Sequence, residues 1–361
     1  MLGVFRKRKQ DWKAEITPSG GQVPVKAGDN LLKSALEAGL RWPHDCRVGS
    51  CGTCRCTLKQ GKVKELSDFA YVLTQKELQS GMILACQAVL RSDVVVEVDL
   101  IEDSAQPVGV TSHEGVIHSV KPLTHDIVEL VIKAADDFPR TARAGQYAEL
   151  AVEGIAIPRS YSFAKAPENE SGREITFFIR RVPGGEFTEW LFARDRAGEA
   201  AVVTGPYGAF WLRPGDCPIV CVAGGSGLAP IKALLESALN AGSGRRVLFL
   251  FGARTRKDLY CLDAMEDLGH QWKGEFEFVP VLSEEPDDSG WNGARGLVTD
   301  YLKQAYADTG RIDFSRSQGY LCGPPPMVDA AAALMSSAGM AKEDIHFDKF
   351  LDASSIPGGR K

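Results

Sequence analysis

The sequence predicts a multidomain protein of mixed α+β and α/β class: a small β-rich domain, an antiparallel β-barrel and a C-terminal parallel sheet flanked by helices. Three observations support this order. The chain has 361 residues, which is enough for two or three domains. Its middle part alternates apolar and polar residues in short runs separated by turns, as antiparallel strands do. Its C-terminal part alternates apolar strands with helix-compatible stretches, which predicts parallel βαβ units.

The composition is that of an ordinary soluble protein, with 44% hydrophobic and 25% charged residues and a net charge of −5. Residues 1–103 carry 15 basic and 13 acidic side chains, so the negative charge lies in the remainder. Since no domain has a broadly basic surface, we expect no nucleic-acid partner. Apolar runs such as Val247–Phe251 are far shorter than the ~18 residues of a membrane span. The N-terminus lacks the apolar core of a secretory signal, and we expect a cytoplasmic protein.

A basic cluster, Arg6–Lys9, lies near the N-terminus beside Leu2, Val4 and Phe5. Two interpretations remain open. A frayed, solvated terminus is the simpler one, and contact with an anionic membrane surface is the other.

Cysteine spacing predicts a metal centre in the first domain. The chain has nine cysteines, and three of them form a C-x4-C-x2-C motif that a fourth follows much later. This is the plant-type spacing for a [2Fe–2S] cluster. The predicted ligands are Cys46, Cys51, Cys54 and Cys86. Gly49 and Gly52 allow the loop to wrap closely and to aim backbone N–H groups at the sulfurs. Zinc is the alternative metal, although structural zinc sites usually use paired C-x2-C or histidine elements.

Local patterns around this motif favour a compact, β-rich domain. Asp29 is typical of a helix N-cap, and it precedes the helix-like stretch Leu31–Leu40. Thr57-Leu58 and Val94–Val98 are predicted strands. Three further cysteines are expected to be small buried side chains, the last two on an apolar strand: Cys56, Cys217 and Cys221.

The second domain follows a linker. The stretch Glu102–Ser112 is rich in Ser, Gln, Pro and Gly and breaks the preceding pattern. From about residue 115 to 211, short alternating runs predict the barrel, with strands at Ile127–Ile132, Tyr147–Val152 and Ile175–Arg180.

The barrel contains a short motif, Arg159–Ser162, whose side chains suit a flavin. Arg159 offers a fork of donors for a pyrophosphate, Tyr161 an aromatic face for an isoalloxazine ring, and Ser162 a hydroxyl for a ring nitrogen. On its own, Tyr161 is equally typical of a barrel-surface aromatic residue.

Two glycine-rich segments follow in the barrel. Gly184 and Gly185 allow backbone to approach a phosphate, and Thr188 lies near the start of a helix whose N–H groups would face the anion. Gly205–Gly208 is the second segment. Taken singly, Gly184-Gly185 is also typical of a hairpin turn.

In the third domain, the apolar strand Ile219–Ala223 runs into a glycine turn at Gly224–Gly227 and then into a helix-compatible stretch. This arrangement presents backbone donors to a dinucleotide phosphate. Pro230 replaces the usual third glycine, so a plain strand–helix connection is also possible. Later predicted strands are Arg246–Phe251, Phe276–Leu282 and Tyr320–Leu321. The last of these strands ends in the segment Cys322–Met327, at the edge of the sheet where ligands bind in such folds.

These motifs occur together in one known family. The segments that carry the likeness are DCRVGSCGTC, LACQA, AGQYAEL, RSYSF, VPGGEFTEWLF, GGSGLAPI, FGARTRKDLYCLD and YLCGPPPMVDAA. In this order they resemble the ferredoxin–NADP reductase superfamily as arranged in NADH-dependent oxygenase reductases. The resemblance covers roughly residues 20–350 and implies a β-grasp ferredoxin domain at 1–103, a linker at 104–112, an FAD-binding barrel at 113–215 and an NAD-binding Rossmann-like domain at 216–361.

The resemblance also implies roles for individual residues. FAD would bind at the Arg-Ser-Tyr-Ser motif and the following glycine turn: Arg159, Ser160, Tyr161, Ser162, Gly184, Gly185 and Thr188. NADH would bind at Gly225, Ser226, Gly227, Cys322 and Gly323. Tyr161, Ser162 and Cys322 would lie closest to the hydride transfer. Arg254, Arg256 and Lys257 lie near the expected adenosine ribose and would also suit a 2′-phosphate, although the family favours NADH. Either Phe347 or Phe350 would approach the flavin, and we expect Phe350.

The function that the resemblance implies is electron transfer from NADH to FAD, to the [2Fe–2S] cluster and then to the hydroxylase of a multicomponent monooxygenase. Likeness to members that serve hydrocarbon monooxygenases implies a membrane di-iron hydroxylase, with peripheral membrane contact through that partner or the basic N-terminus. Alternatives are the reductase of a Rieske dioxygenase, a reductase for nucleotide-sugar deoxygenation, and a zinc-stabilised binding protein on a decayed reductase scaffold.

Overall fold

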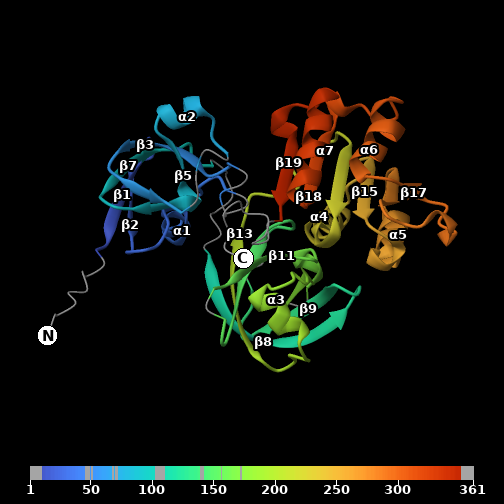
Figure 1. Cartoon of the computed structure of the whole chain (residues 1–361), viewed down its shortest axis with the longest axis horizontal. Helices are drawn as coiled ribbons and strands as arrows, with labels where there is room; N and C mark the ends of the chain where they lie inside the picture. Colours follow the sequence, from blue (N-terminus) through green and yellow to red (C-terminus); the bar gives the residue numbers. More distant parts are fainter. Residues whose placement is uncertain are drawn as a thin grey trace. The chain divides into compact units, whose positions relative to one another are not determined.

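The computed structural model describes residues 10–44, 49, 52–66, 69, 72–101, 110–138, 142–155, 157–170 and 173–350. The chain forms two compact units, residues 1–110 and 111–361 (Figure 1). Among the helices in these ranges, none is both long and apolar enough to cross a membrane. The predicted domain limits at 103, 112 and 215 stay predictions.

Unit 1 is built on a five-stranded mixed sheet with the order β2-β1-β7-β3-β5. β1 pairs in parallel with β7, whereas β2 and β5 pair antiparallel with their neighbours. The strands are β1 (Trp12–Thr17), β2 (Gly21–Val25), β3 (Arg55–Gln60), β5 (Met82–Leu84) and β7 (Val94–Glu97). A separate antiparallel pair is formed by β4 (Val63–Glu65) and β6 (Ala88–Leu90). The predicted strands around Thr57 and Val94 are confirmed.

Helix α1 (Leu31–Glu37) buries five of its seven residues, as its apolar spacing predicts. Its N-cap is Asn30, whose side chain accepts a hydrogen bond of 2.8 Å from the backbone N–H of Lys33. The expectation of Asp29 as the cap is therefore wrong: it lies one residue too early and instead accepts from Lys33 Nζ at 3.0 Å. The second helix, α2 (Gln75–Gln79), begins with a capping box between Thr74 and Glu77.

The first half of unit 2 is an antiparallel six-stranded sheet with the order β11-β10-β13-β8-β9-β12. Its strands are β8 (Thr111–Pro122), β9 (Ile127–Ala134), β10 (Tyr147–Val152), β11 (Arg159–Ser162), β12 (Glu174–Arg180) and β13 (Ala200–Tyr207). A bridge between Phe163 and Phe177 joins the two edges, so the sheet nearly closes into the predicted barrel. Helix α3 (Glu186–Phe192) packs Phe187 and Leu191 into its interior.

The second half of unit 2 is a parallel six-stranded sheet with the order β17-β16-β15-β14-β18-β19. Its strands are β14 (Ile219–Gly224), β15 (Val247–Ala253), β16 (Phe276–Leu282), β17 (Ala294–Arg295), β18 (Gln318–Gly323) and β19 (Ile345–Lys349). The strand order reverses between β14 and β18. In α/β sheets, ligands bind at the carboxyl ends of strands at such a reversal.

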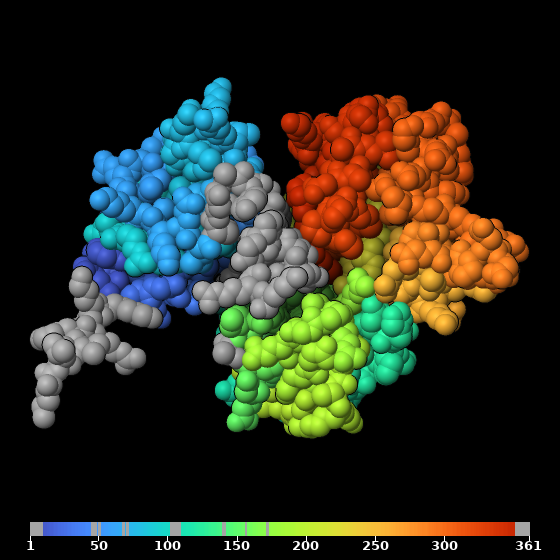
Figure 2. Space-filling view, in the orientation of Figure 1, coloured from blue at the N-terminus to red at the C-terminus, as the bar shows by residue number. Residues whose placement is uncertain are grey.

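Helices cover both faces of the parallel sheet. α4 (Leu228–Asn240) and α5 (Leu262–Gln271) share one buried cluster, and α6 (Val298–Leu302) and α7 (Pro325–Ser337) share the other. Ala164 and Phe178 of the barrel belong to the α4 cluster, so the barrel packs against the α4 side of the sheet. Figure 2 shows the green barrel directly beside the yellow-to-red half of unit 2. The predicted multidomain fold of β-rich domain, barrel and parallel sheet is confirmed.

Burial of the additional cysteines follows the expectation in two of three cases. Cys56 on β3 and Cys221 on β14 are buried. Cys217 is only half-buried and lies before β14, so its expected place on the apolar strand is wrong. Its Sγ accepts a hydrogen bond of 3.4 Å from the Arg245 guanidinium.

Candidate functional site

Two of the four predicted cluster ligands lie at the same end of a strand pair in unit 1. Cys54 directly precedes β3 and Cys86 follows β5, and the register pairs Arg55 with Leu84. The N–H of Ala85 donates to the carbonyl of Cys54 at 3.1 Å, and both cysteines are buried. The strand register thus brings together residues 32 positions apart. Cys46 and Cys51 lie outside the described residues, so the four-cysteine set stays a prediction.

Two described glycines near the predicted ligands have the backbone conformation that a closely wrapped cluster requires. Gly49 has φ +84° and Gly52 has φ +75°, both in the left-handed region. A Cβ on Gly52 would lie 2.8 Å from the Val72 side chain. The Arg55 guanidinium holds this loop, since its Nε donates to the Gly52 carbonyl at 2.9 Å and its Nη1 pairs with Glu77 at 2.8 Å. Buried cysteines beside a glycine loop fit a thiolate-bound [2Fe–2S] cluster.

In the barrel, β11 carries the predicted flavin motif. Tyr161 packs its ring 5.4 Å from that of Phe187, and burial raises the pKa of its hydroxyl, so it is uncharged. The buried Ser162 hydroxyl donates to Asp348 Oδ2 at 3.3 Å. Ser160 is exposed. Arg159 Nη1 donates to the Ile157 carbonyl at 2.7 Å, and the side chain remains partly open to solvent.

The glycine turn before α3 offers an open backbone. Gly184 has φ +73° and nothing within 4 Å of a Cβ position. Gly185 is crowded, since its Cβ would lie 2.8 Å from Thr188 Oγ1. The Thr188 hydroxyl donates to the Val182 carbonyl at 3.1 Å and accepts from the Val182 N–H at 3.1 Å. Thr188 therefore shapes the turn, while the backbone at Gly184 fits the close approach of a phosphate.

The predicted nucleotide turn lies between β14 and α4 as a 3₁₀ turn, Gly225–Gly227, with Ser226 half-buried at its centre. A Cβ on Gly227 would lie 2.3 Å from the carbonyl oxygen of Cys322, so only glycine fits there. Gly225 has φ +56°, and its carbonyl accepts from the buried Tyr260 hydroxyl at 2.9 Å. Crowding at Gly227 holds the turn directly against the neighbouring strand, where a dinucleotide phosphate would meet the backbone.

Cys322 is the last residue but one of β18, on the other side of the strand reversal. It pairs with Ala223 of β14 and with Asp348 of β19. Burial, with a further contribution from the Asp348 carboxylate, raises the pKa of the Cys322 thiol well above its ordinary value. Since only the thiolate is strongly nucleophilic, the side chain is suited to packing against a ligand. Gly323 follows with φ +137°, and its carbonyl accepts from the Phe350 N–H at 2.9 Å.

The two candidate phenylalanines face different sides of the sheet. Phe350 packs against the cluster that includes Ala164 and Phe178 of the barrel. Phe347 packs against the α6 and α7 cluster on the opposite face. Among the described residues, Phe350 is thus the one of the two that shares a cluster with the barrel, and its contact with a flavin stays a prediction.

Two of the basic residues after β15, Arg254 and Arg256, have acidic partners. Arg254 pairs with Asp258 at 3.4 Å and with Asp126 at 3.8 Å, and Arg256 pairs with Glu285 at 2.8 Å. Burial opposes ionisation of Asp258, but hydrogen bonds from Thr255 and the nearby Arg254 and His125 hold its pKa below the ordinary value. The arginines at this strand end are thus neutralised within the protein, which favours NADH over a 2′-phosphorylated nucleotide.

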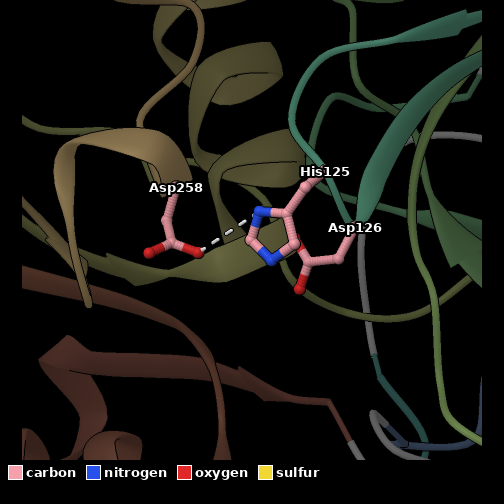
Figure 3. Close-up of side chains that lie close together, drawn as sticks. All are labelled: His125, Asp126 and Asp258. Carbon is pink, nitrogen blue, oxygen red and sulfur yellow. Dashed lines mark ion pairs between the residues drawn. The ribbon is translucent and has the colours of Figure 1, made fainter.

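His125 and Asp126 of the barrel half form a close cluster with Asp258 of the parallel-sheet half of unit 2 (Figure 3). Their ligand-type atoms all lie within 4.8 Å of one another. Asp126 also accepts a hydrogen bond of 2.9 Å from Arg180, in addition to its pairing with Arg254. Two guanidinium groups on one carboxylate identify this cluster as an ion-pair network rather than a cation site.

Sequence reasoning missed the residues that join the barrel to the nucleotide domain. Asp348 lies in an unremarkable Phe-Asp-Lys-Phe stretch, yet it reaches Ser162, 186 residues earlier. Asp126 lies 54 residues from Arg180 within the barrel and also pairs with Arg254 of the parallel-sheet half. Local sequence patterns did not mark these residues as junction contacts, because their partners are distant in sequence.

Three known domain families match consecutive parts of the chain. The 2Fe-2S iron-sulfur cluster binding domain matches residues 14–91. The oxidoreductase FAD-binding domain matches residues 116–211, and the oxidoreductase NAD-binding domain matches residues 221–333. These ranges correspond to the unit 1 sheet, the barrel and the parallel sheet.

The chain is also similar to known proteins over nearly its whole length. It is 44% identical over 335 residues to the xylene/toluene monooxygenase electron transfer component XylA of Pseudomonas putida, covering 93% of this chain and 92% of XylA. It is 34% identical over 353 residues to the phenol 2-monooxygenase reductase component DmpP of Pseudomonas sp. strain CF600, covering 96% of each. The solved structure of the Amycolatopsis cytochrome P450 reductase GcoB matches with a TM-score of 0.80 at 31% identity, covering 94% of this chain and 98% of GcoB.

Proposed function

Because the chain belongs to the family of NADH-dependent flavin and iron–sulfur reductases that serve multicomponent oxygenases, we propose that its acceptor is a membrane di-iron hydroxylase of aromatic or alkyl hydrocarbons. The identity of 44% with the xylene/toluene monooxygenase electron transfer component, against 34% with the phenol 2-monooxygenase reductase component, supports an acceptor that acts on hydrocarbons. The final substrate is selected by that partner.

The chain is an NADH-dependent oxidoreductase with FAD and a [2Fe–2S] cluster, and it delivers electrons to an oxygenase component. When bound, these cofactors convert a two-electron hydride transfer from NADH into one-electron delivery. The protein contributes position, because hydride transfer requires the reacting atoms at roughly 3–3.5 Å in a fixed geometry.

The proposed site rests on one observation: in unit 2, the strands β11, β18 and β19 meet beside the Gly225–Gly227 turn. Ser162 at the end of β11 bonds to Asp348 on β19, and Asp348 pairs with Cys322 at the end of β18. The Cys322 carbonyl in turn packs against Gly227 of the nucleotide turn. In our proposal the flavin lies along Arg159–Ser162 with its phosphates near Gly184, the nicotinamide lies beside Cys322, and the adenosine ribose lies near Arg254.

These residues hold and orient the reactants. The Ser162 hydroxyl donates its proton to Asp348, so its oxygen would face a flavin ring N–H as an acceptor in one defined direction. The buried strand ends around Cys322 exclude water from the place where the rings meet. No nucleophile or general acid–base pair is required.

The first test is an anaerobic NADH titration of the purified chain, followed by visible absorbance. We expect flavin and iron–sulfur bands to bleach together and to saturate near about three electrons per chain, two for the flavin and one for the cluster. Bleaching of the flavin alone would contradict a connected cluster, and a protein with neither flavin nor acid-labile sulfide would end the proposal.

The second test addresses the acceptor. The reduced chain is mixed with membranes that contain a di-iron hydrocarbon hydroxylase, with a soluble di-iron hydroxylase or with a Rieske dioxygenase. We expect substrate-dependent NADH consumption, with hydroxylated product, to be at least about tenfold faster with the membranes. Equal rates with a soluble acceptor would refute the membrane partner.

We also propose that the chain works in the cytoplasm at the membrane surface and that the basic N-terminus contributes to this contact. Arg6–Lys9 lie outside the described residues, so the support is the sequence alone: four adjacent positive charges beside apolar side chains. Deletion of residues 1–10 is expected to weaken binding to anionic vesicles and to leave binding to zwitterionic vesicles unchanged. If coupled turnover and vesicle binding at low salt are both unaffected, this contact is ruled out.

A further inference from the structure

A buried lysine lies on α4, one turn after the nucleotide turn. Lys232 has a side chain only 8% exposed, although lysine is among the residues least often buried. Its neighbours on the helix are the apolar residues Leu228, Ile231 and Leu235, all of which belong to the core. A buried ammonium group requires nearby partners, since leaving it unpaired is costly.

The partners of Lys232 lie across the junction between the two halves of unit 2. Its Nζ donates to the carbonyl of Ala164 in the barrel at 3.3 Å, and it forms an ion pair with Glu236 on the next turn of α4. The other oxygen of Glu236 accepts from the Ala166 N–H at 3.0 Å. One ion pair thus holds two backbone groups of the segment Ala164–Ala166.

The segment Ala164–Ala166 lies just after β11, which carries the predicted flavin motif. Ala164 follows Ser162 by two residues, and the Ala164 N–H is bonded to Thr176 of β12 at 2.9 Å. At the other end, α4 begins directly after Gly227. Lys232 and Glu236 therefore connect the end of the flavin strand to the helix that starts at the nucleotide turn.

A second connection joins the same two parts, because Ser162 bonds to Asp348 and the Cys322 carbonyl contacts Gly227. The two connections reach β11 from different elements, β19 and α4. Together they leave the Ser162 end of β11 little freedom to shift relative to the nucleotide turn.

We propose that Lys232 and Glu236 are positioning residues that fix the Ser162 end of β11 against the Gly225–Gly227 turn and so set the geometry of hydride transfer. This rests on the proposed placement of the flavin along Arg159–Ser162. A buried ion pair is not in itself an efficient source of stability, since apolar residues of similar size often stabilise a protein as well. Its directed bonds to two backbone groups are what apolar residues would not supply.

The test uses a double variant, Lys232→Met with Glu236→Met, in the full-length holoprotein. It removes both charges and both junction bonds but retains unbranched side chains of good helix propensity. The matched control is Ser237→Ala with Asn240→Ala. These residues lie on the same helix and bond the next residues of the same barrel segment, Glu168 and Asn169, at 2.9 Å each, but at exposed positions farther from Ser162.

Two quantities are measured: the limiting rate of flavin reduction by NADH in an anaerobic stopped flow, and deuterium exchange of peptides spanning residues 159–170. We expect the Met variant to lose about tenfold or more in the limiting rate, with the NADH dissociation constant within about threefold of wild type. Exchange at Ala164 and Ala166 should become faster, whereas peptides from α6 should be unchanged. The control variant should keep its limiting rate within about twofold.

A Met variant that reduces its flavin as fast as the control, with unchanged exchange at Ala164 and Ala166, would overturn the proposal. Lys232→Arg, which keeps the charge and the donor, separates geometry from folding. We expect it to recover most of the lost rate, whereas losses equal to those of the Met variant would show that packing alone matters. Wild-type protein in the same assay separates these outcomes from failure of the proposed function, because it must be reduced by NADH in every case.

Discussion

Gly227, in the predicted nucleotide turn, lies where the neighbouring backbone leaves no room for a side chain. The gap between its Cα and the Cys322 carbonyl is closed to any side chain, since a Cβ would lie 2.3 Å from that oxygen and 2.9 Å from the Gly323 Cα. Both obstructing groups are backbone, and backbone in a central parallel strand moves only if the sheet moves. The same crowding is absent at Gly244, where nothing lies within 4 Å of a Cβ position.

Gly227→Ala is therefore expected to push the nucleotide turn away from β18. We predict a fall of about 100-fold in kcat/KM for NADH, as expected for a displacement of the order of 1 Å, with normal FAD content. Steady-state kinetics with ferricyanide as acceptor measures this. Gly244→Ala is the control and should change kcat/KM by less than about twofold; a Gly227→Ala enzyme of normal kcat/KM would contradict the tight contact.

The Cys322 thiol is expected to be unreactive in the folded protein. Burial, aided by the adjacent Asp348 carboxylate, holds its pKa far above neutrality, so the thiolate is scarce at pH 8. Mass spectrometry after treatment with iodoacetamide should find Cys322 modified in fewer than about one in ten molecules, and fully modified in urea. Rapid alkylation of Cys322 in native protein, with loss of activity, would show instead that it is a reactive group.

At the scale of elements, the loop that carries Gly52 is held by a neighbouring helix. Arg55 at the start of β3 bonds both the Gly52 carbonyl and Glu77, and Glu77 is part of the capping box of α2. Hydrogen bonds from Thr74, assisted by Arg55, hold the pKa of Glu77 below its ordinary value, so this carboxylate stays charged near neutrality. Arg55 thus connects Gly52 to α2.

Arg55→Met should loosen this connection without removing a predicted ligand. We expect the [2Fe–2S] chromophore to be lost about five- to tenfold faster in the presence of a chelator at moderate temperature, because the loop opens more often. Absorbance in the visible range follows the loss. Lys59→Met, on the same strand and similarly exposed with an ion pair to Glu97, is the control and should match wild type. Equal loss rates in both variants would remove Arg55 from this role.

The strand pair β18 and β19 carries a histidine whose charge opposes folding. Burial, with repulsion from Arg213, lowers the pKa of His346 to about 4. Its ring lies 5.0 Å from that of Tyr320. The unfolded chain binds a proton here below its usual value near 6.5, whereas the folded chain does so only below about 4. Neutral His346 therefore adds fully to the stability of the folded protein above pH 6.5. This stability is lost as the pH falls from about 6.5 to about 4, because protonation of the histidine favours the unfolded chain.

His346→Gln, which does not titrate, should reduce this pH dependence. Between pH 4 and pH 6.5, the free energy of unfolding of wild type should rise by about 3 kcal/mol more than that of the variant. Denaturant unfolding of both proteins at the two pH values measures the difference. Parallel pH profiles for wild type and variant would refute the lowered pKa.

The elements themselves were largely predictable from sequence, whereas the contacts between them were not. Period-two alternation placed β10 and β12 nearly to the residue, and the apolar run before Gly224 placed β14, because local periodicity reflects which face is buried. The N-cap of α1 was predicted one residue too early, because Asp29 and Asn30 are neighbours and both residue types are good N-caps. Lys232 and Asp348 gave little local signal, since their partners lie 68 and 186 residues away. The ligand roles of Cys46 and Cys51 rest on spacing alone.

At the scale of the whole molecule, the chain separates the predicted cluster from the nucleotide chemistry. Residues 1–110 form one compact unit, and the barrel and parallel sheet share the other. The barrel and the parallel sheet share a hydrophobic core, because Ala164 and Phe178 of the barrel belong to the cluster around α4. The residues that we propose for hydride transfer all lie within one unit.

A fragment of residues 111–361 is accordingly expected to fold, to bind FAD and to be reduced by NADH. It should accept about two electrons instead of about three, and it should reduce ferricyanide but not the oxygenase partner. An anaerobic titration of the fragment measures the electron count. A fragment that aggregates or that lacks flavin would show that unit 1 is needed for the fold of unit 2.

The two compact units belong to one polypeptide, and this has a kinetic consequence. A separate ferredoxin would have to find its reductase by diffusion, so its reduction would slow in proportion to dilution. Here the donor and the acceptor of the internal electron transfer share a covalent connection around residue 110, which gives them an effective local concentration of the order of millimolar. Internal reduction of the cluster is therefore a first-order process at any protein concentration, and only the final encounter with the oxygenase depends on how much of each protein the cell makes.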